Sequence, residues 1–245
     1  LKADGSIKAW GSGDFGGTGA PTGTGFIQIY STGQAFAGLK ADGTVVAWGN
    51  TGGGGLGAPT GNGFVDIFST GYSFAALRND GSIASWGSSD YGGTGSPVGT
   101  GFTSIFSSAG AFAALKSDGS VQAWGNYWNG GQGAPTGSGY VSISTTHAAF
   151  AASKADGSIT SWGHSVFGGN DAPQGSGYRG VFSNYGSFAA ISGDGAIKSW
   201  GSPDYGAPSK APTGTGYANF KATRYASAAL NLSLIHISEP TRPER

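Results

Sequence analysis

Short apolar segments separated by polar, glycine-rich stretches recur along the whole chain. In one repeat, residues 64–68, 73–77 and 82–86 are apolar, aromatic and β-branched, and Asp80-Gly81 lies between the second and the third. An Asp-Gly pair between two apolar runs favours a hairpin with a type I′ turn, which needs positive φ at both central residues. Residues 87–101 hold mainly Gly, Ser, Thr and Pro and indicate a connecting loop. We therefore expect three strands and one long loop in each repeat.

The repeat has a fixed length. A Trp-Gly step returns every 38 residues, and an Asp-Gly pair precedes each tryptophan by the same distance. Such a period is the signature of a repeat protein. The tryptophans are Trp10, Trp48, Trp86, Trp124, Trp162 and Trp200, and we interpret them as core residues. The six units are residues 1–38, 39–76, 77–114, 115–152, 153–190 and 191–229, within one repeat domain over residues 1–231.

The strands are apolar on both faces, so each small sheet needs cover on both sides. Radial packing of similar sheets, a β-propeller, provides this cover and leaves only short edges. We predict an all-β chain, a β-propeller of six three-stranded, 38-residue blades, and expect seven or more blades in the natural protein. A linear β-solenoid is the alternative. Strands from the two ends of the repeat domain together complete one blade, which permits closure of a ring.

Composition argues against several classes of protein. The 49 glycines and 10 prolines suggest low complexity, but only 11% of residues are charged and 13% are aromatic, unlike a disordered polyelectrolyte. Basic and acidic residues balance at 13 each, and no window clusters the basic ones as nucleic-acid binding requires. No apolar run reaches the length of a membrane-spanning helix. The lack of cysteine removes disulfides and thiol chemistry.

Candidate catalytic chemistry is sparse. His147 and His164 each occur in one unit only, without a partner visible in the sequence, so we expect surface or loop histidines. The repeated aspartates are explained by the turns they begin, and no calcium loop of the D-x-D-x-D-G type is present. The G-x-G steps, such as Gly99 and Gly101, lack the helix and third glycine of a dinucleotide site. We predict no enzyme, no catalytic residue, no metal and no cofactor.

Two sets of variable loops are expected at one edge of the sheets, with the Asp-Gly turns at the other edge. The turns hardly differ between units, whereas both sets of loops differ strongly. A diversified face is typical of binding in repeat proteins, and Tyr, Trp and Phe are favoured at protein interfaces. The predicted binding residues are Phe15, Tyr72, Tyr91, Tyr127, Trp128, Phe167, Tyr185, Tyr205 and Tyr225, with Asp14, Asp90 and Asp204.

Some of these aromatic residues have a second interpretation. Phe15, Tyr91, Phe167 and Tyr205 all lie five residues after a repeated tryptophan. Their positions are explained equally well if their side chains cover the junctions between blades. Tyr72, Tyr127 and Trp128 break the pattern of their units, which favours recognition.

Residues 232–245 do not fit the repeat. They lack glycine, and through Arg242 they resemble the translation of a common sequencing adaptor. We expect a disordered, non-native tail in which His236, Glu239 and Arg242 carry no function, and a chain cut at both ends, so that six units are a minimum. The alternative is a disordered C-terminal extension of the protein itself.

The repeat itself resembles a known family. The string A-L-K-x-D-G-S-x-x-A-W-G, followed by G-G, a proline and an x-I-x-S-T/A-G strand, recurs over residues 1–231. It is similar to the short bacterial form of the regulator-of-chromosome-condensation repeat, especially to the secreted beta-lactamase inhibitory members. The resemblance implies a seven-bladed propeller that binds a protein through aromatic and acidic loops on one face. It places Phe15, Tyr91, Phe167 and Tyr205 on the loop that carries binding aromatics.

Departures from the family pattern limit what carries over. The G-G-x-G-A-P-T-G loop and the lack of a histidine after the first strand argue against inhibition of beta-lactamases. Short units without a basic segment argue against nucleotide exchange on a GTPase. We therefore expect a secreted or cell-surface, monomeric, non-enzymatic module that binds a protein or a surface glycan, but no nucleic acid. The alternative is a structural repeat segment of a large adhesin without a discrete ligand.

Overall fold

The computed structural model describes residues 2–231, which form seventeen strands and six short 3₁₀ helices. Blade 1 is β1 (Phe26–Ser31), β2 (Ala35–Lys40) and β3 (Val45–Gly49); blade 2 is β4 (Phe64–Ser69), β5 (Ser73–Arg78) and β6 (Ile83–Gly87); blade 3 is β7 (Phe102–Ser107), β8 (Ala111–Lys116) and β9 (Val121–Gly125). Blade 4 is β10 (Tyr140–Thr145), β11 (Ala149–Lys154) and β12 (Ile159–Gly163); blade 5 is β13 (Tyr178–Ser183), β14 (Ser187–Ser192) and β15 (Ile197–Gly201); blade 6 is β16 (Tyr217–Ala222) and β17 (Ser227–Asn231). The adaptor-like tail lies outside the described residues.

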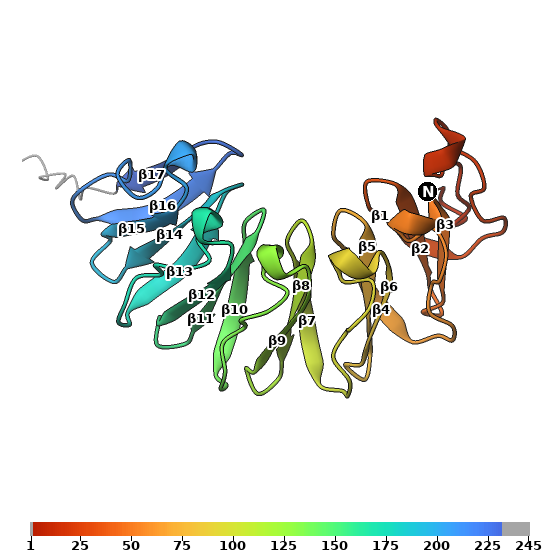
Figure 1. The fold of residues 1–245 in the computed structure, drawn as a ribbon, viewed down its shortest axis with the longest axis horizontal. Coiled ribbons are helices and arrows are strands. Elements are labelled where there is room, and N and C mark those ends of the chain that lie inside the picture. Colours follow the sequence, from red (N-terminus) through yellow and green to blue (C-terminus); the bar gives the residue numbers. More distant parts are fainter. Residues whose placement is uncertain (1, 232–245) are drawn as a thin grey trace, which may run out of the picture.

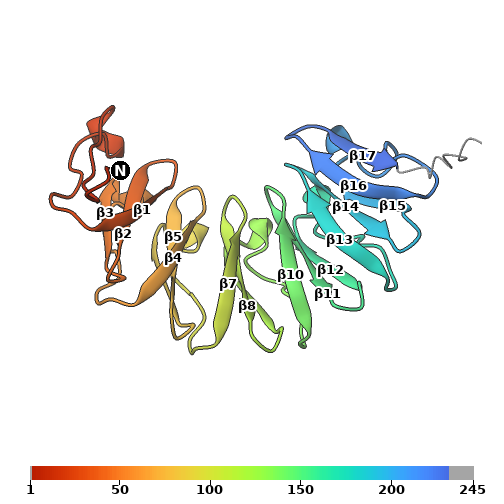
Figure 2. The same cartoon turned by 180° about the vertical axis from the view of Figure 1, so that it is seen from behind.

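Each blade is an antiparallel sheet in chain order, with its second strand in the middle. Five sheets have three strands, and the sixth has two among the described residues. The prediction of an all-β propeller built from three-stranded blades is thus confirmed. The sheets stand side by side in a curved row whose two ends lie apart, so the described residues form an open fan (Figures 1 and 2).

The Asp-Gly hairpins differ from the predicted type I′ turn. Gly81 has φ +77°, but Asp171 is the only non-glycine residue with a positive φ in residues 2–231, so Asp80 does not adopt the left-handed conformation. The Gly81 amide donates to the carbonyl of Arg78, and the Arg78 amide donates to the carbonyl of Ser82. These bonds describe a longer turn with a glycine bulge. Asp80 accepts from the Ser82 amide at 2.8 Å, which lowers the pKa of its carboxyl group.

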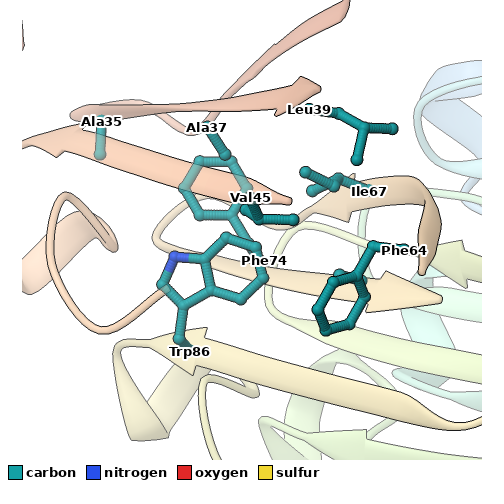
Figure 3. Close-up of a cluster of buried hydrophobic side chains, with 9 residues drawn as sticks. Ala35, Ala37, Leu39, Val45, Phe64, Ile67, Phe74 and Trp86 are labelled. Carbon is teal, nitrogen blue, oxygen red and sulfur yellow. The ribbon is translucent and has the colours of Figure 1, made fainter. Parts of the chain in front are cut away.

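The core of the molecule lies between neighbouring blades. Figure 3 shows Phe74 and Trp86 of blade 2 packed on Ala35 and Ala37 of blade 1. The rings of Phe74 and Trp86 stack with their centroids 5.0 Å apart, and Trp86 Nε1 donates to the carbonyl of Gly54 at 3.0 Å. Gly54 belongs to the loop that leaves blade 1, so each such tryptophan joins its own blade to the preceding one. The same stack and bond recur at Trp48, Trp124, Trp162 and Trp200.

Trp10 is the exception to the predicted core role. Its side chain is 86% exposed, whereas the other five repeated tryptophans are buried. In blades 1–5 a phenylalanine of the middle strand lies opposite the tryptophan, as Phe188 lies opposite Trp200. Residues 2–25 precede β1 and contain no strand, so Trp10 has no such partner within the described chain.

Candidate functional site

The two sets of variable loops do share one edge of the row of blades. The tips of the hairpins after the first strands and the 3₁₀ helices lie along the upper, concave side in Figure 1, and the Asp-Gly turns lie along the lower side. The helices are η1 (Gly13–Phe15), η2 (Thr51–Gly53), η3 (Ser89–Tyr91), η4 (Tyr127–Asn129), η5 (Ser165–Phe167) and η6 (Pro203–Tyr205). Sequence analysis predicted an irregular loop where each of these helices occurs. We call this side the concave edge.

Main-chain hydrogen bonds join the hairpin tips of successive blades. At each junction an amide of one tip donates to a carbonyl of the next, so the tips form one continuous chain of contacts. The bonds are Gly33 to Gly71 (2.9 Å), Gly71 to Ala109 (2.8 Å), Ala109 to His147 (2.9 Å), His147 to Tyr185 (2.8 Å) and Tyr185 to Arg224 (3.4 Å). Because the backbone of every tip is fixed by its neighbour, the side chains at these positions have defined places along the edge.

Polar side chains of the tips hold the 3₁₀ helices in place. The Thr70 hydroxyl donates to the carbonyl of Tyr91 at 3.1 Å, and the Thr146 hydroxyl donates to the carbonyl of Phe167 at 2.9 Å. In blade 5 the amide of Asn184 donates to the carbonyl of Tyr205 at 2.7 Å. The last residues of these three helices are therefore anchored by their backbones, which leaves their side chains available for contacts.

Aromatic side chains of blades 4–6 form a continuous row on the concave edge. His147 stacks on Tyr185 with ring centroids 4.5 Å apart, Tyr185 contacts Tyr205 at 5.3 Å, and Tyr205 stacks on Tyr225 at 5.7 Å. The guanidinium of Arg224 lies 4.3 Å from the centre of the Tyr185 ring. We call these five residues the aromatic row. Pre-arranged aromatic faces of this kind present a large contact area with little side-chain entropy left to lose.

A hollow of about 520 Å³ continues this surface between blade 4 and the loop that leaves blade 3. Tyr127, Trp128 and His164 line it, and the ring centroids of Trp128 and His164 are 6.2 Å apart. Phe167 links the hollow to the aromatic row, since its ring contacts both His164 (5.4 Å) and His147 (5.5 Å). The side chain of Trp128 is 67% exposed.

Most of the remaining predicted residues do not join this surface. Tyr72, at the tip of blade 2, and Tyr91, on η3 in the loop that leaves blade 2, form a separate pair with ring centroids 4.7 Å apart. Phe15 and Asp14 lie on η1 at the other end of the row. Asp90 is exposed on η3, whereas Asp204 is exposed on η6 directly before Tyr205 of the aromatic row and lines a cavity together with Tyr225. Phe167 also packs against the core between blades 4 and 5, which fits its second interpretation as junction cover.

Sequence reasoning missed three members of the surface. His147 and His164 are loop residues as predicted, but they lie within the aromatic contacts, and Arg224 covers Tyr185. The sequence feature that could have revealed them is the residue type at one repeat position, that of the hydrogen-bonded hairpin tips. This position holds Gly33, Gly71 and Ala109 in blades 1–3, and His147, Tyr185 and Arg224 in blades 4–6. The change from small to large residues at this one repeat position marks the blades that carry the surface.

Burial lowers the pKa of His147 below its ordinary value of 6.5, and the charge of Arg224 lowers it further. Since folding favours the neutral imidazole, the stability linked to this group is fully present above pH 6.5 and is lost as the pH falls through the lowered pKa. We expect Arg224→Ala to raise the pKa of His147 while leaving it below 6.5, because burial remains.

An NMR titration of the imidazole measures this change. Arg179→Ala is the matched control, since Arg179 contacts the carbonyl of Gly193 rather than the aromatic row. Equal His147 pKa values in the wild type and Arg224→Ala would contradict the proposed contact.

The described residues were also searched for metal-ligand clusters and for membrane-spanning helices. No three His, Asp or Glu side chains gather as metal ligands anywhere in residues 2–231. Within that range, no helix has the length and apolar character needed to cross a membrane.

Comparison with known proteins identifies the fold. The sequence matches no protein family model and no curated protein. The structure is similar to the ectodomain of the receptor kinase CR4 of Physcomitrella patens, with 20% identity, a TM-score of 0.55, and coverage of 88% of this chain and 60% of that one. It is also similar to the CRINKLY WD40 ectodomain of the Arabidopsis thaliana receptor kinase ACR4, with 20% identity, a TM-score of 0.53, and coverage of 85% and 76%.

A third similar structure is yeast RCC1 (Prp20) bound to Kap60, with 16% identity, a TM-score of 0.52, and coverage of 84% of this chain and 68% of that one. The chain thus has an RCC1-like propeller fold. It spans 60% of the length of the moss ectodomain.

Proposed function

We propose that this chain, an RCC1-like propeller, is a non-enzymatic module that binds a protein partner through the concave edge of blades 4–6. The observation that carries the proposal is the aromatic row together with the hollow beside it. Aromatic and arginine side chains dominate the energetic centres of protein interfaces. Here they are contiguous, and hydrogen bonds between blades hold their backbones in place.

The chemistry of the surface indicates the kind of partner. Tyr225 is 62% exposed, and the rings of Tyr185 and Tyr205 lie between it and His147. Arg224 adds one positive charge, and its guanidinium lies over the rings of both Tyr185 and Tyr225. An apolar patch with hydrogen-bond acceptors and an acidic group beside it complements such a surface.

The similar structures support this class of function. Yeast RCC1 was crystallised bound to Kap60, and both plant structures are ectodomains of receptor kinases. We also propose that the module acts outside the cell, as those ectodomains do.

The test is an affinity measurement with a triple variant. The immobilised chain captures proteins from the extracellular fraction of the organism that carries the gene, and each captured protein is then purified for surface plasmon resonance. We expect Trp128→Ala/Tyr205→Ala/Tyr225→Ala to weaken binding by about 100-fold or more, because it truncates three contact residues at once. The thermal midpoint should change little, since Trp128 and Tyr225 are largely exposed.

The matched control is Leu56→Ala/Val98→Ala, which removes exposed apolar side chains outside blades 4–6. Equal affinity of the triple variant and this control would contradict a binding surface on the concave edge and favour a purely structural repeat segment. A partner that still binds after proteolysis, but not after removal of its carbohydrate, would be a surface glycan.

A further inference from the structure

The loop that leaves blade 3 carries its aromatic residues at unusual positions. In four of the other five loops, the fifth residue after the repeated tryptophan is aromatic, but here it is Asn129. Tyr127 and Trp128 come one and two positions earlier. Phe167 and Tyr205, at the fifth position, contact hairpin tips, whereas Tyr127 and Trp128 line the hollow described above. The shift in position therefore gives these two rings a different use from the aromatic row.

The backbone beneath the two rings is fixed by hydrogen bonds. The amide of Gly131 donates to the carbonyl of Asn126 at 2.8 Å, and the hydroxyl of Ser108 donates to the carbonyl of Asn129 at 2.8 Å. The rings of Tyr127 and Trp128 are almost perpendicular, at 84°, with their centroids 5.2 Å apart. Both side chains are more than half exposed. A flat, accessible ring with a fixed orientation is suited to contact the apolar face of a ligand.

Polar side chains surround this platform. Gln132, Ser161, His164 and Ser165 all line the hollow, and no hydrogen bond within residues 2–231 uses the side chains of Gln132, Ser161 or Ser165. His164 Nδ1 accepts from the amide of Val166 at 3.2 Å, so the neutral imidazole carries its proton on Nε2. The hollow thus offers amide, hydroxyl and imidazole groups beside an aromatic face.

The composition of the lining selects among classes of ligand. No lysine, arginine, aspartate or glutamate is among the described residues that line the hollow, which disfavours an ionic ligand. An apolar side chain would cover the polar groups without giving them hydrogen-bond partners, which is costly. A pyranose ring has C–H groups on its faces and hydroxyl groups around its rim, so it satisfies both parts of the lining. The volume of about 520 Å³ lies within the usual range of small-ligand sites.

We propose that the hollow binds a neutral hexopyranose residue of a glycan carried by the protein partner. One face of the sugar lies on Trp128, and its hydroxyl groups bond to Gln132, Ser161 and His164. The inference rests on the proposed function, because Phe167 joins the hollow to the aromatic row and one partner can therefore cover both. The row contacts the protein part of this partner, and the hollow contacts its sugar.

Free sugars test the hollow without the partner. The probes are methyl β-D-glucoside, methyl β-D-galactoside and the methyl glycoside of N-acetylglucosamine, each titrated into the whole chain and followed by NMR. We expect at least one of them to move the indole N–H resonance of Trp128, with a dissociation constant of about 1–10 mM, as is usual for so small a ligand. The constant should be the same at about 0.05 and 0.5 M NaCl, since no charged side chain lines the hollow.

Saturation-transfer NMR on the sugar compares the variants. Trp128→Ala should weaken sugar binding by at least about tenfold, and Gln132→Ala by about two- to tenfold. The matched controls are Trp10→Ala and Leu56→Ala, which should leave binding unchanged. Trp10 is another exposed tryptophan, and Leu56 is exposed at the same position of its loop as Gln132.

The purified partner tests where the sugar comes from. Enzymatic removal of its glycan should weaken its binding by the same factor as Trp128→Ala does. The two changes together should weaken binding no more than either alone, because both remove one contact. Tyr205→Ala/Tyr225→Ala should still weaken binding of the deglycosylated partner, since the aromatic row contacts its protein part.

Three results would overturn the sugar site. One is a Trp128 resonance that no glycoside moves at concentrations up to about 100 mM. Another is sugar binding that Trp128→Ala leaves unchanged. The third is a resonance moved by N-acetyl-L-phenylalaninamide and by no glycoside, which would assign the hollow to an apolar side chain of the partner.

The proposed function has a separate readout. Weaker partner binding by Tyr205→Ala/Tyr225→Ala would leave it standing even if the sugar site fails. Glycoside binding in the hollow, together with a partner that binds this variant as tightly as the wild type, would contradict the aromatic row alone.

Discussion

Replacing Trp86 with alanine is expected to lower the free energy of unfolding by about 3–5 kcal/mol, the cost of truncating a large buried aromatic residue. The side chain is 4% exposed and lies between blade 2 and blade 1, stacked on Phe74. The truncation also leaves the carbonyl of Gly54 without its donor, which loosens the loop that leaves blade 1. Urea denaturation followed by circular dichroism measures the change.

Trp10→Ala is the matched control for this variant, because it removes the same side chain from a position that is 86% exposed. Its free energy of unfolding should stay within about 0.5 kcal/mol of the wild-type value. Equal destabilisation by Trp86→Ala and Trp10→Ala would contradict the assignment of Trp86 to the core between blades.

Gly81→Ala should destabilise the fold by about 2–5 kcal/mol through two separate costs. Gly81 has φ +77°, where a residue with a Cβ is strained by about 1–2 kcal/mol. An added Cβ would also lie 2.6 Å from the backbone nitrogen of Gly101 and 2.7 Å from that of Phe102, so the turn would have to move from the next blade at a cost of about 1–3 kcal/mol. This movement breaks the bond from the Phe102 amide to the Gly81 carbonyl.

Gly95→Ala separates the two costs. Gly95 has nearly the same conformation, φ +82°, but no atom lies within 4 Å of its added Cβ. It should therefore lose only about 1–2 kcal/mol in the same urea titration. A Gly95→Ala variant as unstable as Gly81→Ala would show that backbone strain alone, and not contact between blades, accounts for the effect.

The period of the sequence was enough to predict the blades, because every strand is a short apolar run beside a fixed glycine or tryptophan. Turn geometry was harder to predict. Asp80-Gly81 is compatible with several hairpins, and the choice between them depends on contacts with Gly101 and Phe102 of the next blade. The 3₁₀ helices were missed for a related reason. Tertiary bonds such as that from Thr70 to Tyr91 anchor them, and local sequence does not encode those bonds.

The site was partly predictable. Sequence variation placed Tyr185, Tyr205 and Tyr225 on one edge, and the structure brings their rings together. His147 looked isolated in the sequence because its neighbours, Phe167 and Tyr185, come from a different loop and a different blade. The surface is formed by contacts between different loops and different blades, and the sequence of a single unit does not show these contacts.

The chain of hydrogen bonds along the hairpin tips has a mechanical consequence. Each tip bonds to the tips of its neighbouring blades and to no more distant tip, so a pulling force applied at the two ends passes through every junction in series. The weakest junction then yields first. That junction is the one between blades 5 and 6, where the tip bond is the longest at 3.4 Å and a cavity of about 250 Å³ lies between the two blades. Stretched in an optical trap, the molecule should release blade 6 at the lowest force and then open one blade at a time.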